Sequence, residues 1–230
     1  MFRNREDAAT QLAARFSGRK LQDPLILAIP RGGIVTGIVL ARELDAELDV
    51  ILACKLRCPG HPELALGAIS ESGAVHLKPS ADDILAERQD YLAGERRHQL
   101  EEIAGRRLIF RDVRAAASVA GRSVVVTDDG VATGSTMIAS LQTVRAQHPK
   151  ELIVAIPVAP KATIVELKRW ADEVVCVLAA EHFYSVGQFY QHFEPVDDEQ
   201  AVHLLRRAVD LRERRRSSGE GNSGEYQQTA

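Results

Sequence analysis

Short apolar runs alternate with longer amphipathic segments along most of this chain. The runs are continuous and rich in β-branched residues, the pattern of strands buried on both faces, and they lie at residues 25–29, 48–54, 123–127, 152–158 and 174–178. The amphipathic segments have the spacing of helices, and they lie at 6–17, 33–44, 136–147, 163–170 and 197–212. This alternation predicts an α/β domain with a doubly wound, mostly parallel sheet and flanking helices. Ligands of such sheets bind at the carboxyl ends of the strands.

Two further segments are expected to decorate this sheet. Residues 67–77 contain two short apolar runs separated by Glu71-Ser72-Gly73, which predicts a hairpin. Residues 82–107 are highly charged but keep apolar residues at near-helical spacing, so we expect a long inserted surface helix. From residue 217 the chain is rich in Ser, Gly, Gln and Glu. We therefore expect one domain over 1–212 and a disordered tail over 213–230.

The overall composition is that of an ordinary globular domain, with 45% hydrophobic and 27% charged residues. No apolar run approaches the ~20 residues of a membrane-spanning helix, and no apolar signal core follows the N-terminus. A cytoplasmic protein without a membrane partner is therefore expected. Cys54, Cys58 and Cys176 lack the second Cys/His pair of a zinc site, so we expect ordinary reduced thiols.

The net charge of −3 argues against general nucleic-acid binding, which needs a basic surface. Between Arg206 and Ala230, six arginines stand against four acidic residues, so this end carries +2 and the rest of the chain −5. The basic run at 212–216 leaves nucleic-acid binding open as an alternative. Such a run before a polar tail is more often a solvated face.

Residues 124–136, Val-Val-Val-Thr-Asp-Asp-Gly-Val-Ala-Thr-Gly-Ser-Thr, carry the most informative chemistry. A β-branched strand runs into Asp128 and Asp129, and a glycine-containing loop then leads into a helix. Glycines let backbone amides approach a phosphate, and the helix N-terminus supplies unpaired N–H groups and partial positive charge. The two carboxylates suit neighbouring ribose hydroxyls, for which they are acceptors. The pattern predicts a sugar-phosphate site.

Other interpretations of this loop fit less well. A bare Asp-Asp-Gly is often a turn that caps a helix without a ligand, but here the full strand, loop and helix context is present. An ATP-type P-loop needs a Lys after its last glycine, where this chain has Ser135. A dinucleotide fingerprint needs Gly-x-Gly-x-x-Gly directly after a strand, and no strand expected in this sequence leads into one.

This stretch resembles the 5-phosphoribosyl-1-pyrophosphate (PRPP) motif of type I phosphoribosyltransferases. The resemblance implies the fold of that family, with a small hood at about 179–196. It also implies that Asp128 and Asp129 act in catalysis by holding the ribose hydroxyls. The residues implied to bind the ribose and its 5′-phosphate are Asp128, Asp129, Gly130, Val131, Ala132, Thr133, Gly134, Ser135 and Thr136. Purine-salvage relatives often carry an Asp at the position of Ala132, so hypoxanthine-guanine chemistry is not expected.

A second strand-to-helix junction, Pro30-Arg31-Gly32-Gly33, has the features of an anion site. Its glycines expose backbone amides, and Arg31 adds a cation with bidentate reach. The alternative is a tight turn with an exposed arginine. The resemblance identifies Arg31, Gly32 and Gly33 as the pyrophosphate loop. It implies that Lys55, predicted at the end of the second strand, also contacts pyrophosphate and acts in catalysis with Arg31.

The adjacent aromatics Phe183 and Tyr184 follow the last strand, although only 5% of the chain is aromatic. The resemblance implies a hood here, in which Phe183, Tyr184 and Val186 bind the acceptor. The alternative is that the two rings pin the loop onto the core. Phe2-x-Asn4-Arg5 and Phe183-Tyr184-x-Val186-Gly187 look most like a bacterial branch of uncharacterised phosphoribosyltransferase-like proteins, some of them fused to a hydrolase domain.

The sequence therefore predicts a transferase of nucleotide metabolism, which displaces pyrophosphate from the ribose C1 of PRPP with a nitrogen acceptor. Mg²⁺ is the expected cofactor, held mainly by PRPP and not by direct protein ligands. The alternative from another class is a PRPP-binding regulator or sensor without chemistry, and the presence of Arg31 and Lys55 favours the enzyme. The acceptor and the oligomeric state cannot be read from the sequence, and a homodimer is compatible with the resemblance.

Overall fold

A central sheet of five parallel strands organises the computed structural model, which describes residues 1–77, 81 and 89–220. The strands run in the order β2-β1-β6-β7-β8. Their bounds are β1 Leu25–Ala28, β2 Glu47–Val50, β6 Ser123–Thr127, β7 Glu151–Pro160 and β8 Glu173–Ala180. The order reverses between β1 and β6, which makes this point the topological switch of a doubly wound sheet. The predicted fold class is therefore confirmed.

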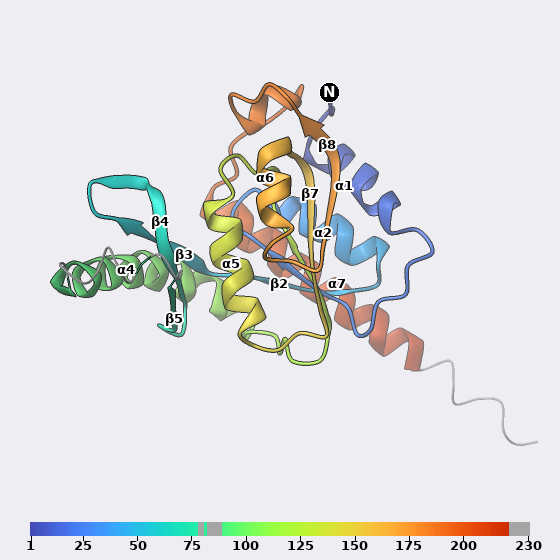
Figure 1. Cartoon of the computed structure of the whole chain (residues 1–230). Coiled ribbons are helices and arrows are strands. Elements are labelled where there is room, and N and C mark those ends of the chain that lie inside the picture. The colour runs from blue at the N-terminus through green and yellow to red at the C-terminus, as the bar shows by residue number, and fades with distance from the viewer. Residues whose placement is uncertain (78–80, 82–88, 221–230) are drawn as a thin grey trace, which may run out of the picture.

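Helices cover both faces of this sheet (Figure 1). On one face lie α1 (Arg5–Ala13), α2 (Gly33–Glu43) and α7 (Asp198–Glu220), and on the other lie α5 (Ser135–Arg145) and α6 (Lys161–Leu167). Strand alternation explains the two layers, because successive side chains point to opposite faces. Ile26 and Ala28 pack in the core cluster of α1 and α2, whereas Leu25 and Leu27 pack in the cluster of α5.

An arm of one antiparallel sheet and one long helix projects from this body (Figure 1, left). The sheet has the order β3-β4-β5, with β3 Ala53–Cys58, β4 His61–Ser70 and β5 Val75–Leu77, and the helix is α4, Gln89–Val113. The hairpin predicted over 67–77 is formed by β4 and β5, and Gly73 in its turn has φ 81°. The predicted surface helix extends to Val113 instead of 107, and its predicted start at 82–88 lies outside the described residues.

One predicted strand was wrong in its extent. The run at 48–54 is divided between β2, which pairs in parallel with β1, and β3, which pairs antiparallel with β4. The hydrophobic pattern does not show this change of sheet, because both strands bury their side chains and the apolar run continues from one to the other. The division matters for Lys55, which lies inside β3 and not at the end of a central strand.

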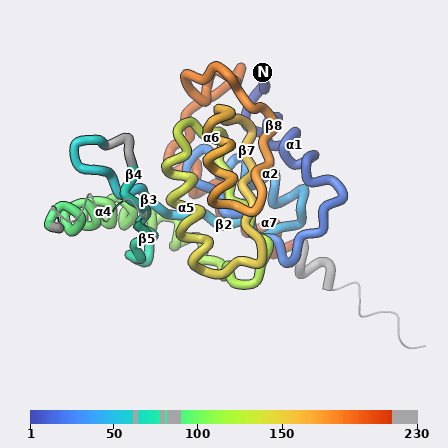
Figure 2. Tube along the Cα trace, in the orientation of Figure 1, coloured from blue at the N-terminus to red at the C-terminus, as the bar shows by residue number. Residues whose placement is uncertain are grey.

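The N-terminus lies beside the segment that follows β8, as the trace in Figure 2 shows. The backbone N–H of Phe2 donates to the Phe189 carbonyl at 2.8 Å, and Gln191 N–H donates to the Phe2 carbonyl at 2.9 Å. The short helix η2 (Val186–Phe189) belongs to this segment, and η1 (Ala14–Phe16) ends the first helical stretch. The first residues of the chain and the segment after β8 are thus joined above the carboxyl edge of the sheet.

The last helix is longer than predicted, because α7 ends at Glu220 and not at 212. The residues up to 216 are mostly strong helix formers such as Arg, Leu and Glu, which favours this longer helix. Residues 221–230 lie outside the described part of the chain. No helix in the described ranges is both long and apolar enough to span a membrane.

Candidate functional site

The loop after β6 lies at the carboxyl edge of the sheet and is fixed there by hydrogen bonds. Its backbone is tied to the neighbouring strand, since the N–H of Val131 donates to the Val158 carbonyl at 3.0 Å, and Thr163 Oγ1 donates to the Ala132 carbonyl at 2.7 Å. Gly134 has φ 79° just before α5, a conformation that favours glycine. Ala132, Thr133 and Thr136 are exposed. The first N–H groups of α5 have no intrahelical partner, so the loop presents hydroxyls and amides to an anion.

The loop after β1 lies directly against the acid pair. A Cβ placed on Gly32 would meet Asp129 Oδ2 at 1.9 Å, and one on Gly33 would meet the Asp128 Cα at 3.0 Å. A side chain at position 32 would therefore displace the Asp129 carboxylate from its place beside this loop. Arg31 is exposed at the head of this loop, and its peptide bond to Pro30 is cis. The structure brings Asp128, Asp129, Gly32 and Gly33 together, as a pair of adjacent anion loops requires.

The two carboxylates differ in their surroundings. Asp128 Oδ1 accepts the backbone N–H of Asp129 at 2.8 Å. Burial, together with the negative charge of Asp129, raises the pKa of Asp128 well above its ordinary value. Asp129 instead forms an ion pair with Arg5, in which Nε lies 2.6 Å from Oδ2 and both side chains are nearly buried. The Tyr190 hydroxyl donates to the Asp129 carbonyl.

Arg5 is a site residue that reasoning from the sequence missed. It stands at the start of α1, whose N-cap Asn4 accepts the Asp7 N–H through its side chain at 2.9 Å. Its sequence separation from Asp129 is 124 residues, so no local pattern joins them. The only sign was the Phe2-x-Asn4-Arg5 resemblance, which carried no role for the arginine.

The segment after β8 forms an aromatic cluster beside the acid pair. The rings of Tyr190 and Phe193 are 4.8 Å apart, and those of Phe183 and Phe189 are 5.2 Å apart. Val186 lies over Gly130, where a Cβ would meet its Cγ1 at 2.5 Å. Tyr184 differs from these side chains, because it is 91% exposed. The predicted hood residues thus divide into Phe183 and Val186, which pack, and Tyr184, which faces solvent.

Lys55 does not stand where the sequence placed it. It is half-buried within β3 and pairs across the ladder with Ala68 of β4. The predicted position at the end of a central strand is therefore wrong, because the chain leaves the parallel sheet after Val50. The hairpin of β3 and β4 packs against α5, the helix that follows the acid pair.

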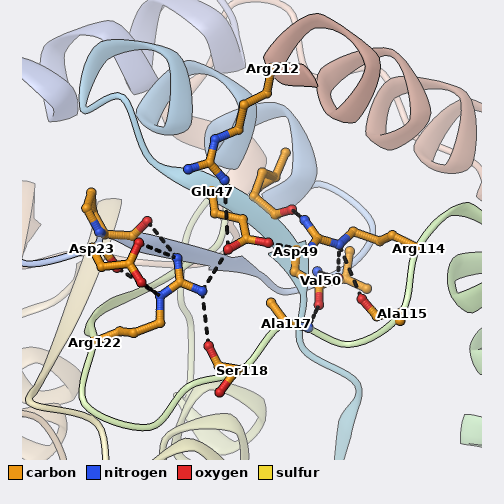
Figure 3. Close-up of polar contacts among 12 residues, drawn as sticks. Asp23, Glu47, Asp49, Val50, Arg114, Ala115, Ala117, Ser118, Arg122 and Arg212 are labelled. Carbon is orange, nitrogen blue, oxygen red and sulfur yellow. Dashed lines mark hydrogen bonds and ion pairs between the residues drawn. The ribbon is translucent and has the colours of Figure 1, made fainter. Parts of the chain in front are cut away.

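A cavity of about 730 Å³ lies at the opposite edge of the sheet, where β2 begins. Residues of α2, β2 and α7 line it, among them Ile38, Glu47, Leu204 and Arg207, and none of the predicted site residues does. Beside it, Glu47 is surrounded by Arg114, Arg122 and Arg212 (Figure 3). With Asp49 beside Arg114 and Asp23 beside Arg122, three carboxylates balance the three arginines in a cluster that connects elements. The loops, where the amides at the start of α5 and the acid pair meet, are therefore the candidate site.

The described residues contain no group of three or more His, Cys, Asp or Glu side chains placed to hold a metal ion. In the acid pair, one oxygen of each carboxylate is engaged by the protein, by the Asp129 N–H and by Arg5 Nε, so the pair is not a preformed metal site. The residues present thus fit a cation that arrives with a phosphorylated ligand, and they do not form a metal cage of their own.

The sequence and the fold both have relatives among known proteins. Residues 2–193 match the family described as "Phosphoribosyl transferase domain". Two proteins of Mycobacterium tuberculosis, from strain CDC 1551 / Oshkosh and strain ATCC 25618 / H37Rv, are each named "Putative phosphoribosyl transferase". Each is 37% identical over 211 residues, which cover 90% of this chain and 47% of the relative. This chain therefore spans about half the length of the curated relatives that it matches.

A solved structure has the same fold over nearly its full length. The crystal structure of TT1426 from Thermus thermophilus superposes with a TM-score of 0.85 at 40% sequence identity, covering 90% of this chain and 98% of that one. Because the family match includes both loops, the acid pair and the aromatic segment, it extends over every element that builds the site. This chain belongs to the type I phosphoribosyl transferase family.

Proposed function

We propose that this domain binds PRPP and transfers its phosphoribosyl group to a nitrogen acceptor with release of pyrophosphate. The observation that carries the proposal is the contact between the two loops, in which Asp129 Oδ2 lies 1.9 Å from the position of a Cβ on Gly32. This closeness supports the proposal, because one ligand could then reach both the carboxylates and the amides of the second loop. Membership of the family supports phosphoribosyl transfer in general, and the choice of PRPP and a nitrogen acceptor is our inference.

Each part of the site has a role in this proposal. The carboxylates of Asp128 and Asp129 accept the ribose hydroxyls, and the backbone and hydroxyls from Gly130 to Thr136 bind the 5′-phosphate. Gly32 and Gly33 give amides to pyrophosphate, and Arg31 gives it a bidentate cation. Lys55 belongs to this set only if the β3–β4 hairpin closes over the ligand.

The reaction needs positioning and charge neutralisation more than covalent help from the protein. The bond from ribose C1 to the pyrophosphate oxygen breaks with its electron pair going to that oxygen, and the acceptor nitrogen bonds to C1 and loses a proton to pyrophosphate or solvent. Negative charge grows on pyrophosphate during this step, so Arg31 stabilises the transition state more than the ground state. Mg²⁺ bound to PRPP would add positive charge at the same group.

The acid pair provides the first test. Asp128→Asn with Asp129→Asn should weaken PRPP binding by about 1.5–3 kcal/mol for each charged hydrogen bond lost. Isothermal titration calorimetry with PRPP and Mg²⁺ measures this change. Asp210→Asn on the exposed face of α7 is the matched control and should bind as the wild-type protein does. Equal PRPP affinity in the double variant and the control would exclude this site.

Turnover separates an enzyme from a regulator. The wild-type protein with PRPP and Mg²⁺ is incubated with a panel of nucleobases and amines, and pyrophosphate release is followed. Release that depends on one acceptor supports the transferase. Tight PRPP binding without pyrophosphate release from any acceptor would favour the sensor, which keeps the loops and omits the chemistry.

A further inference from the structure

Arg5 is held beside the acid pair by contacts from three directions. Its Nε donates to Asp129 Oδ2 at 2.6 Å, and its Nη1 donates to the Glu194 carbonyl at 2.7 Å. The guanidinium carbon lies 3.8 Å from the centre of the Phe193 ring. The Arg5 and Asp129 side chains are only 11% and 13% exposed. Arg5 is therefore a fixed cation, and solvent screens its charge little.

These contacts decide how Asp129 can face a ligand. Oδ2 is enclosed between Arg5 Nε and the α-carbon of Gly32, where no side chain could fit. Asp128 is fixed in a comparable way, since its Oδ1 accepts the Asp129 N–H. Each carboxylate thus has one oxygen engaged by the protein, which orients the group as a whole. A carboxylate oriented in advance loses less freedom when it accepts a hydroxyl.

The positive charge of Arg5 also affects how an anionic ligand can bind beside the acid pair. The proposed ligand carries a phosphate and a pyrophosphate, and two bare carboxylates beside it would repel both groups. The Arg5 charge offsets one of these carboxylates at hydrogen-bond distance. Tyr190 of the aromatic segment also faces the pair, because its hydroxyl donates to the Asp129 carbonyl.

We propose that Arg5 is a positioning residue of this site: it orients Asp129 toward a ribose hydroxyl and offsets the charge of the acid pair, so that the phosphates of PRPP can bind beside it. The inference rests on the proposed function. The contacts between the N-terminus and the aromatic segment would then serve the site, because Phe193 and Glu194 hold Arg5 in place.

A purely structural Arg5 would instead fasten α1 to the aromatic segment, and pH separates the two roles. Burial and the charge of Asp129 raise the pKa of Asp128, whereas the charge of Arg5 lowers it. Without Arg5 the pair should therefore keep a proton to higher pH. That proton offsets the charge of the acid pair as Arg5 does in the wild-type protein. The loss of PRPP affinity in a variant without Arg5, relative to the wild-type protein, should therefore shrink as the pH falls. A structural defect would give a loss that does not follow this titration.

The experiment measures PRPP affinity by calorimetry in a pH series for the wild-type protein, Arg5→Gln, Arg5→Lys and the control Arg3→Gln. Arg3 is 77% exposed and pairs with Asp7 of its own segment. Arg5→Gln should weaken binding about 10- to 100-fold at alkaline pH, the loss expected for one charged hydrogen bond, and less at acidic pH. Arg5→Lys keeps the charge and should recover part of the affinity, and Arg3→Gln should bind normally.

Arg5→His protects the test against misfolding of the Gln variant, because an imidazole, whose ordinary pKa is about 6.5, loses its charge within the pH series. Its affinity relative to the wild-type protein should fall as the pH rises through the pKa of the imidazole. Wild-type affinity in Arg5→Gln at every pH overturns the role of Arg5 and leaves the proposed function standing. A loss that is equal at every pH and is not relieved by Lys also overturns it. A wild-type protein that does not bind PRPP overturns the proposed function, and this inference with it.

Discussion

At the scale of single residues, folding disfavours the ionised form of one carboxyl group of the site, Asp128. Burial raises the pKa of Asp128, and the charge of Asp129 raises it further. A group with a raised folded-state pKa binds more protons in the folded protein than in the unfolded one. Stability then falls as the pH rises from the ordinary value of 3.8 toward the folded-state value. The acid pair is kept at the expense of stability, as functional sites often are.

The variant Asp128→Asn tests this cost directly. The amide keeps the oxygen that accepts the Asp129 N–H and removes the buried charge, so the melting temperature at neutral pH should rise. Each kcal/mol relieved corresponds to about 2–4 °C at this chain length. The gain should disappear below the ordinary pKa of an aspartate, where the wild-type carboxyl is also neutral. Thermal unfolding across a pH series checks both points, and a lower melting temperature at neutral pH would contradict the assignment.

The residues of the site could be predicted only in part. Asp128, Asp129 and the glycines after them are adjacent in sequence, so strand, acid pair and loop appear together as one pattern. Gly32 could be identified because it belongs to a local Gly-Gly motif directly after a strand, a pattern that is visible in the sequence. Arg5 could not, because its partner is 124 residues away and a lone arginine at a helix start has many uses. Long-range ion pairs leave no periodic trace in a sequence.

At the scale of elements, the central strands and the helices between them followed their hydrophobic patterns closely, and β6 has the predicted bounds. Patterns failed where one apolar run serves two sheets. Val50 ends a strand paired in parallel with β1, and Ala53 begins one paired antiparallel with β4. Burial is the same on both sides of that join, so only the pairing partners distinguish the strands. The position of Lys55 was wrong for this reason.

The aromatic segment gives a prediction at the same scale, because its two neighbouring rings have opposite environments. Phe183 packs against Phe189 and is half-buried, so Phe183→Ala should cost about 2–4 kcal/mol of stability, somewhat less than a fully buried ring. Tyr184 is 91% exposed, so Tyr184→Ala should change stability by about 0.5 kcal/mol or less. If Tyr184 stacks on the acceptor, its loss should raise the acceptor KM about 5- to 150-fold, as expected for 1–3 kcal/mol of stacking.

Thermal unfolding and steady-state kinetics on the two alanine variants check this division, with PRPP affinity as the common reference. Normal acceptor KM in Tyr184→Ala would remove this tyrosine from the acceptor site. A large stability loss in Tyr184→Ala would show that its ring is covered in solution.

At the scale of the whole molecule, charged residues far from the site add a second set of contacts between elements that already share one hydrophobic core. Glu47, the first residue of β2, accepts from Arg114, which follows α4, and pairs with Arg122 before β6 at 2.7 Å. Arg212 of α7 lies 3.8 Å from the same carboxylate. Figure 3 shows the three guanidinium groups arranged around it. One carboxylate thus connects the arm, the sheet and the last helix, and the basic end of the chain is part of the fold at Arg212.

Removing this carboxylate should therefore destabilise the molecule without touching the site. Glu47→Gln removes a half-buried carboxylate from among three arginines and should cost about 1.5–3 kcal/mol at neutral pH, the range for a hydrogen bond to a charged group. This loss corresponds to a fall of about 3–12 °C in melting temperature. PRPP affinity of the folded variant should stay unchanged, because Glu47 stands at the amino end of β2 and the loops stand at the carboxyl ends of the strands.

The pH dependence of this loss distinguishes an ionic cluster from simple packing. Burial opposes ionisation, but hydrogen bonds from Arg114 and Arg122 hold the pKa of Glu47 below its ordinary value of 4.5. A depressed folded-state pKa stabilises the protein above the unfolded value and loses that effect as the pH falls through the folded one. The wild-type protein should therefore lose its advantage over Glu47→Gln in acid. Glu43→Gln, which removes an exposed pair with Arg42, is the control and should change stability by about 0.5 kcal/mol or less at any pH. A deficit in Glu47→Gln that persists undiminished below pH 4.5 would mean that the side chain's packing, and not its charge, holds these elements together.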